Sequence, residues 1–258
     1  MNRIASAVLS RAPTRENGGS LPSFYGAGCY DCAMKGYRTG EHALAIYLSS
    51  IAGFVDTLGF LYLGGYFLSF MSGNTTRLTA AVNAGKWDVA MTAGGVMALF
   101  LIGVGIGALI SQLGQRYLPR TRTREAILLF ICATSTIASV LVLTGHEQWA
   151  VYSLSFTVGA MNSTFERDGE VSISLTYMTG TLVKMSQRFV AALFGGPHLD
   201  WLRYFALWMA LACGALLGGW MYVQVGLHAV LVVTGMLYAG TGTALVYRQW
   251  RRNRGLAV

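Results

Sequence analysis

The residue that stands out for its chemistry is Asp56, which lies in an otherwise uncharged and largely apolar stretch, residues 42–65. A carboxylate in such surroundings costs several kcal/mol unless it has a partner, and acids inside membranes are usually functional. We therefore expect Asp56 to take part in proton or cation coupling. The alternative is a buried ion pair with Arg77 or Lys184 that only fixes helix packing.

Two short segments rich in Gly and hydroxyl groups could bind a polar ligand. They are Ser72-Gly73-Asn74-Thr75 and Thr179-Gly180-Thr181. Gly lets the backbone leave helical geometry, and Ser, Thr or Asn can cap the first N–H groups of a helix. If both helix starts point toward the membrane midplane, their positive dipole ends would attract an anion or polarise a neutral solute. The alternative is an ordinary re-entrant turn whose caps only satisfy buried backbone groups.

A basic residue follows each segment at the same distance. Arg77 and Lys184 each come four residues after the Gly of their segment, one helical turn along. Matched basic groups favour an anionic solute. They could instead reach lipid headgroups, or pair with acids such as Asp56, Glu166 or Asp168.

Membrane-spanning helices must position these groups, because 54% of the side chains are hydrophobic and only 12% are charged. A span needs roughly 20 apolar residues. The sequence predicts an all-α membrane protein with about six transmembrane helices. They are expected within residues 42–65, 89–113, 126–144, 149–165, 204–226 and 227–246.

Basic residues gather at three places, and by the positive-inside rule all three should be cytoplasmic. These are the N-terminal tail (residues 1–41), the loop from Arg116 to Arg124 and the C-terminal tail (residues 248–258). Both termini are then expected inside the cell, with the protein in the inner membrane. Because orientation explains the net charge of +8, no nucleic-acid partner is predicted.

The sequence also repeats itself. Met71-Ser72-Gly73 corresponds to Met178-Thr179-Gly180 (178 − 71 = 107), and Asp56 to Asn162 (162 − 56 = 106). The GxxxG pairs Gly103/Gly107 and Gly214/Gly218 correspond with an offset of 111 (214 − 103) and predict close helix packing, within the bundle or at a homo-oligomer interface.

Residues 42–145 and 146–247 therefore form two predicted membrane repeats. Each contains three spans and a short re-entrant or amphipathic helix, within residues 72–86 and 172–193. Three spans is an odd number, so the second repeat should be inverted in the membrane relative to the first. If the short helices were full spans instead, the Arg116 loop would face outward, against the positive-inside rule.

The motifs together resemble the YoaK-like family of bacterial inner-membrane proteins, a family of unknown function. They are Gly53 to Asp56, Ser72-Gly73-Asn74 and Thr179-Gly180-Thr181, and the resemblance covers residues 43–247. The segment starting Asn162-Ser163 is similar to a Gln-Asn segment of the family, from which it differs. The resemblance implies a multi-spanning helical bundle and supplies no substrate.

Signatures of enzymes and metal sites are missing from the sequence. There is no Gly-x-Ser-x-Gly elbow, phosphate-binding loop, dinucleotide fingerprint or paired-His zinc helix. Cys29 and Cys32 form one Cys-x-x-Cys pair without a second pair or a His, which is usually incidental. We therefore predict no catalytic residues, metal or cofactor, and an enzyme is the less favoured class.

The leading hypothesis is a secondary transporter or facilitator for a small polar, anionic solute, with its site between the two halves. Asp56 would couple or gate, and Arg77 and Lys184 would supply positive charge. The other predicted site residues are Ser72, Gly73, Asn74, Thr75, Asn162, Thr179, Gly180 and Thr181. The alternatives are an intramembrane enzyme that uses Asp56, and a non-transporting membrane sensor or assembly factor.

Overall fold

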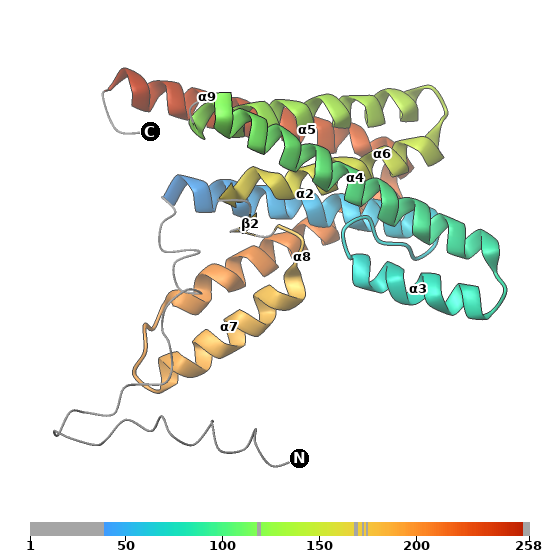
Figure 1. The fold of residues 1–258 in the computed structure, drawn as a ribbon, viewed down its shortest axis with the longest axis horizontal. Coiled ribbons are helices and arrows are strands. Elements are labelled where there is room, and N and C mark those ends of the chain that lie inside the picture. Colours follow the sequence, from blue (N-terminus) through green and yellow to red (C-terminus); the bar gives the residue numbers. More distant parts are fainter. Residues whose placement is uncertain (1–38, 118–119, 168–169, 172, 174, 255–258) are drawn as a thin grey trace, which may run out of the picture. The chain divides into compact units, whose positions relative to one another are not determined.

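A computed structural model of the chain describes residues 39–117, 120–167, 170–171, 173 and 175–254 (Figure 1). These residues belong to one compact unit, Gly36–Val258. The predicted N-terminal tail up to residue 38 and the Cys29 and Cys32 pair lie outside the described residues.

The described chain is almost entirely helical, as the sequence predicts. The α-helices are α2 (Thr39–Leu63), α3 (Met71–Asn83), α4 (Trp87–Tyr117), α5 (Arg120–Leu143), α6 (Glu147–Met161), α7 (Met178–Leu193), α8 (Asp200–Val225) and α9 (Ala229–Asn253). Single 3-10 turns, η1 (Asn162–Phe165) and η2 (Gly226–His228), follow α6 and α8. Two strands of two residues each, β1 (Glu166–Arg167) and β2 (Glu170–Val171), pair antiparallel between η1 and α7.

Four stretches of the described chain are long and apolar enough to cross a membrane: Gly40–Leu63, Trp87–Tyr117, Arg122–Leu143 and Asp200–Trp250. The last stretch contains two helices, α8 and α9. The chain turns between them at Gly226, whose φ is 60°. α6 has 15 residues, fewer than the roughly 20 that a span usually needs. The described chain is thus almost entirely helical with four candidate membrane spans, fewer than the six that the sequence predicts.

The basic segment between α4 and α5 is more helical than the sequence predicts. Arg116 belongs to the last turn of α4, and α5 already begins at Arg120. Arg is a good helix former, so a helix can continue past the end of its apolar window. Residues 118–119 of the predicted loop lie outside the described residues.

Glycines let α2 and α8 approach until their backbones touch. A Cβ added to Gly214 of α8 would overlap the carbonyl oxygen of Ser50 in α2, and one at Gly218 would lie 2.5 Å from that of Phe54. Conversely, a Cβ at Gly53 of α2 would overlap the carbonyl oxygen of Leu211. The residue numbers rise together, so the two helices run parallel.

The helices α4 and α6 make the equivalent contact. A Cβ at Gly103 would overlap the carbonyl oxygen of Phe156, and one at Gly107 would lie 3.0 Å from that of Ala160. The glycines of the two contacts differ by 214 − 103 = 111 and the carbonyls by 156 − 50 = 106. Residues that correspond by the sequence offsets thus make corresponding contacts, and α4 runs parallel to α6.

Hydroxyl groups join α5 to α9. The Thr234 hydroxyl lies 2.6 Å from that of Ser135 and 2.7 Å from that of Ser139, and it also donates to the Ser135 carbonyl at 3.1 Å. Polar contacts of this kind hold helices together in lipid, where apolar side chains gain nothing from leaving water.

The glycine contacts lead to a stability prediction. Gly214→Ala should destabilise the purified protein by about 1–3 kcal/mol, because its Cβ meets backbone atoms of α2 that cannot move aside. The control is Gly235→Ala in α9, where the Cβ would enter open space. We expect a lower melting temperature in detergent for Gly214→Ala alone, and equal melting of both variants would contradict the packing.

Candidate functional site

The chain between α2 and α3 forms a non-helical segment, residues 64–70, which we call loop A. Gly64 and Gly65, with φ of 72° and 103°, turn the chain back from the end of α2. Leu68 is then fully buried. Buried backbone N–H and C=O groups need hydrogen-bond partners, and loop A lacks the internal bonds of a helix. Several of the predicted site residues supply those partners.

Asp56 binds the far end of loop A. Its Oδ1 accepts the backbone N–H of Leu68 at 2.7 Å and that of Ser69 at 2.8 Å. Hydrogen bonds to a charged acceptor are stronger than neutral ones. This carboxylate is therefore bound by loop A. Among these residues the structure does not contain the predicted alternative, an ion pair of Asp56 with Arg77 or Lys184.

Arg77 of α3 binds the near end of the same loop. Its guanidinium donates to the carbonyl of Gly65 at 2.8 Å and to that of Gly64 at 3.0 Å. The guanidinium also lies over the Tyr66 ring, 4.1 Å from its centroid, a cation–π arrangement. A positive and a negative side chain thus hold the two ends of one loop.

Asn74 binds the middle of loop A and is itself fully buried. Its Oδ1 accepts the N–H of Phe67 at 3.0 Å, and its Nδ2 donates to the Phe67 carbonyl. The side-chain amide thus pairs with one residue in the manner of a neighbouring strand. Asp at position 74 would lack the N–H donor, and Leu would lack both the donor and the acceptor.

The second repeat uses neutral side chains in the corresponding places. The chain before α7, residues 175–177, is called loop B. The Thr176 hydroxyl donates to Oδ1 of buried Asn162 at 3.1 Å, and Asn162 also donates to the Val158 carbonyl. Asn162 and Thr176 correspond to Asp56 and Ser69 by offsets of 106 and 107. Thr181, at the position of Asn74, is buried and donates to the Tyr177 carbonyl at 3.2 Å.

Two buried serines that the sequence analysis missed tie each loop to the opposite half. Ser155 of α6 lies 3.3 Å from the Leu68 carbonyl of loop A and 3.0 Å from the Val96 carbonyl of α4. Ser49 of α2 lies 3.4 Å from the Leu175 carbonyl of loop B and 3.2 Å from the Leu207 carbonyl of α8. All three corresponding pairs differ by the repeat offsets (155 − 49 = 106, 175 − 68 = 107, 207 − 96 = 111). The signal in the sequence that could have identified these two serines is their separation by the repeat offset.

The remaining predicted site residues lie at the surface of α3 and α7. Ser72, Thr75, Thr179 and Lys184 are exposed. An aromatic ring packs against each of Gly73 and Gly180, that of Phe70 and that of Tyr177 respectively. A Cβ at either glycine would collide with the ring. The predicted set is therefore divided between groups that hold the loops and groups that face outward.

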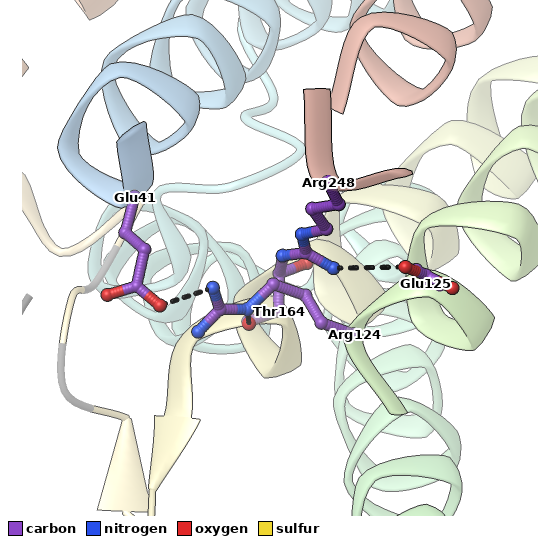
Figure 2. A network of polar contacts seen from close by, with 5 residues as sticks. All are labelled: Glu41, Arg124, Glu125, Thr164 and Arg248. Atoms are coloured by element: carbon purple, nitrogen blue, oxygen red, sulfur yellow. Dashed lines mark hydrogen bonds and ion pairs between the residues drawn. The ribbon is translucent and has the colours of Figure 1, made fainter. Parts of the chain in front are cut away.

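A network of charged side chains joins the ends of several helices (Figure 2). Arg124 of α5 binds Glu41 of α2 at 2.7 Å and the Thr164 carbonyl of η1 at 3.2 Å. Arg248 of α9 lies 3.8 Å from Glu125 of α5. The starts of α2 and α5 and the ends of α6 and α9 consequently lie together.

The described residues contain no group of three His, Cys, Asp or Glu side chains that could hold a metal ion. Asp56 binds the backbone N–H groups of Leu68 and Ser69 and also the Ser69 side chain. The arrangement holds the loop through hydrogen bonds to its backbone.

The contacts of Asp56 lead to a second prediction. Asp56→Leu should leave two buried N–H groups without an acceptor, at about 1–3 kcal/mol each, whereas Asp56→Asn keeps one oxygen acceptor. We expect faster hydrogen exchange at residues 68–69 and a lower melting temperature, both larger for Leu than for Asn. Protected amides in Asp56→Leu would mean that Asp56 does not hold loop A.

Comparisons with known proteins identify the family to which the chain belongs. Residues 44–243 match the profile of a family described as "Protein of unknown function (DUF1275)". The chain is 29% identical over 210 residues to the UPF0700 transmembrane protein RA0705 of Rhizobium meliloti (strain 1021), covering 81% of this chain and 88% of that protein. It is 27% identical over 159 residues to the UPF0700 transmembrane protein YoaK of Bacillus subtilis (strain 168), covering 60% and 69% respectively.

No solved structure matches the chain. The family match covers most of the sequence, and both relatives carry the word transmembrane in their names. The resemblance predicted from the motifs is confirmed: this chain is an integral membrane protein that belongs to the DUF1275 family, the family of YoaK.

Proposed function

We propose that this protein is a secondary transporter or facilitator for a small polar, anionic solute, built from two inverted three-span repeats. The observation that carries the proposal is the pair of interior loops, each bound by a serine of the other half. Non-helical backbone at membrane depth is tolerated where it is buried in protein or lines a cavity. Transporters with inverted repeats build their substrate sites from such interrupted helices.

The chain directions support six crossings. The charge network joins the starts of α2 and α5 to the ends of α6 and α9. Because α8 runs parallel to α2 and α4 to α6, α8 should start on this side and α4 should end on it. Each of these six helices then crosses once, whereas α3 and α7 begin and end on one side of the membrane, and on opposite sides from each other.

The side that carries the charge network is the cytoplasmic one in this proposal. Arg116, Arg122 and Arg124 lie at the junction of α4 and α5, and Arg248 and Arg254 lie near the end of α9. Basic residues flanking membrane spans favour the cytoplasm. Both termini would then be cytoplasmic, α3 would lie on the outer side and α7 on the inner side.

The helix starts after the two loops favour an anion. Neither Phe70 before α3 nor Tyr177 before α7 makes a side-chain hydrogen bond to the first turn of its helix. The first N–H group of each helix donates to a loop carbonyl, Met71 to Ser69 and Met178 to Thr176, and the positive end of the helix dipole favours negative charge nearby. Exposed Lys184 supplies a further positive charge along α7.

In this proposal the serines decide which loop is held. The Ser155 hydroxyl, with one proton to donate, lies between carbonyls of loop A and α4, and the Ser49 hydroxyl lies between carbonyls of loop B and α8. Opening toward one side would break one set of bonds while the equivalent set persists. Asp56 would couple this movement to a cation or proton, because neutralising its charge weakens its bonds to loop A.

The topology can be tested by labelling. In a variant without the four native cysteines, a single cysteine is placed at exposed Lys86, after α3, or at exposed His198, after α7. A membrane-impermeant maleimide should label Lys86→Cys in intact cells or spheroplasts, and His198→Cys only after permeabilisation. Labelling of both from one side would rule out the inverted arrangement.

Transport itself is tested by flux into proteoliposomes with chloride, formate and inorganic phosphate as probes. Wild type should move at least one of these anions, and Ser155→Ala or Ser49→Ala should change its rate by about three- to tenfold through the loss of one buried hydrogen bond. The matched control is Ser50→Ala, whose hydroxyl donates within α2 to the Tyr47 carbonyl.

The same experiment can reject the proposal. Flux of every probe equal to that of empty liposomes contradicts an anion transporter of this kind. Equal flux in wild type and both serine variants would leave transport standing but exclude the loop mechanism. If replacing Asp56 with a non-ionisable residue leaves a measured flux unchanged, Asp56 has no coupling role.

A further inference from the structure

The helix α7 differs from its counterpart α3 in the charge that it leaves exposed. Arg77 is the basic residue of α3, and it is bound to the carbonyls of loop A. Its counterpart Lys184 is exposed on α7. Arg188 follows four residues later, so both cations lie on the same side of the helix.

The start of α8 adds another cation at the same level. The Phe189 and Trp201 rings pack edge to face with centroids 5.4 Å apart, which joins the end of α7 to the start of α8. Arg203, two residues after Trp201, is exposed. The acid in this part of the hairpin is Asp200, in the first turn of α8, so positive charge predominates.

Large apolar side chains are exposed on the same hairpin. Val190 is 50% exposed, Leu193 69% and Phe194 86%. The main contact of α7 is with α8, which leaves this side of α7 without cover from the described helices. A helix with a basic side, an apolar side and nearby Trp and Phe is typical of helices that lie at a membrane surface.

We propose that the hairpin of α7 and α8 binds anionic phospholipids, with exposed Lys184 and Arg203 contacting the headgroup phosphates. Exposed Val190, Leu193 and Phe194 would face the lipid beside the hairpin. Anionic lipids give the cytoplasmic surface a negative potential, worth about 1 kcal/mol per nearby basic residue. This inference goes beyond transport and rests on the cytoplasmic position of α7 in the proposed topology.

The test is lipid binding to the full-length protein in neutral detergent, measured by native mass spectrometry with phosphatidylglycerol or phosphatidylcholine. Wild type should bind phosphatidylglycerol at least about tenfold more tightly than phosphatidylcholine. Lys184→Gln with Arg203→Gln should lose most of this preference. Lys184→Arg with Arg203→Lys keeps both charges and should retain it.

The matched control removes two exposed cations elsewhere, Arg116→Gln with Arg122→Gln. An equal loss in the control, or an unchanged preference in the hairpin variant, would overturn the assignment. Displacement of the lipid by inorganic phosphate at equal concentration would assign the site to free anions and also overturn it. Because no flux is measured, a failure of the transport proposal would be seen separately, in proteoliposomes.

Discussion

The structure depends on one constraint: backbone that leaves helical geometry inside an apolar bundle must find other hydrogen-bond partners. Loop A meets it with side chains. Arg77 donates to the carbonyls at the start of the loop, and Asn74 binds both backbone groups of Phe67. Asp56 accepts the N–H groups of Leu68 and Ser69. Burying a charged or amide side chain in such surroundings costs free energy, and the hydrogen bonds of these three side chains to the loop offset that cost. Glycine-mediated contact between helix backbones then brings Ser155 close enough to complete the set.

The second half meets the same constraint with weaker chemistry. Asn162 stands where Asp56 does, Thr181 stands in place of Asn74, and Lys184 is exposed where Arg77 is bound. Charge-assisted hydrogen bonds are roughly twice as strong as neutral ones. Loop A should therefore cost more to release than loop B. In a transport cycle that alternates between the two loops, the resting state would favour the one in which loop A is held.

Much of this arrangement follows from the sequence, and the rest depends on backbone geometry that a sequence does not contain. Apolar windows predicted the long helices, and residue type identified Asp56 as a group needing a partner and Asn74 and Arg77 as site residues. The partners could not be predicted, because they are loop carbonyls and N–H groups, not other side chains. Ser49 and Ser155 were missed since a serine in a span is common, and only the contact with a loop distinguishes them. Helix continuation through Arg116 and from Arg120 was missed because charge ends an apolar window without ending a helix.

A structural and a coupling role for Asp56 are compatible, and the first makes the second physically reasonable. The carboxylate accepts two N–H groups of loop A, and these bonds favour its charged form. By linkage, whatever neutralises the carboxylate must weaken the hold on the loop, and whatever releases the loop must make neutralisation easier. A proton or cation that reaches Asp56 would therefore shift the population toward the released loop by the difference in its affinity for the two states. A purely structural Asp56 would differ from a coupling Asp56 in one respect, because no proton or cation could reach its carboxylate.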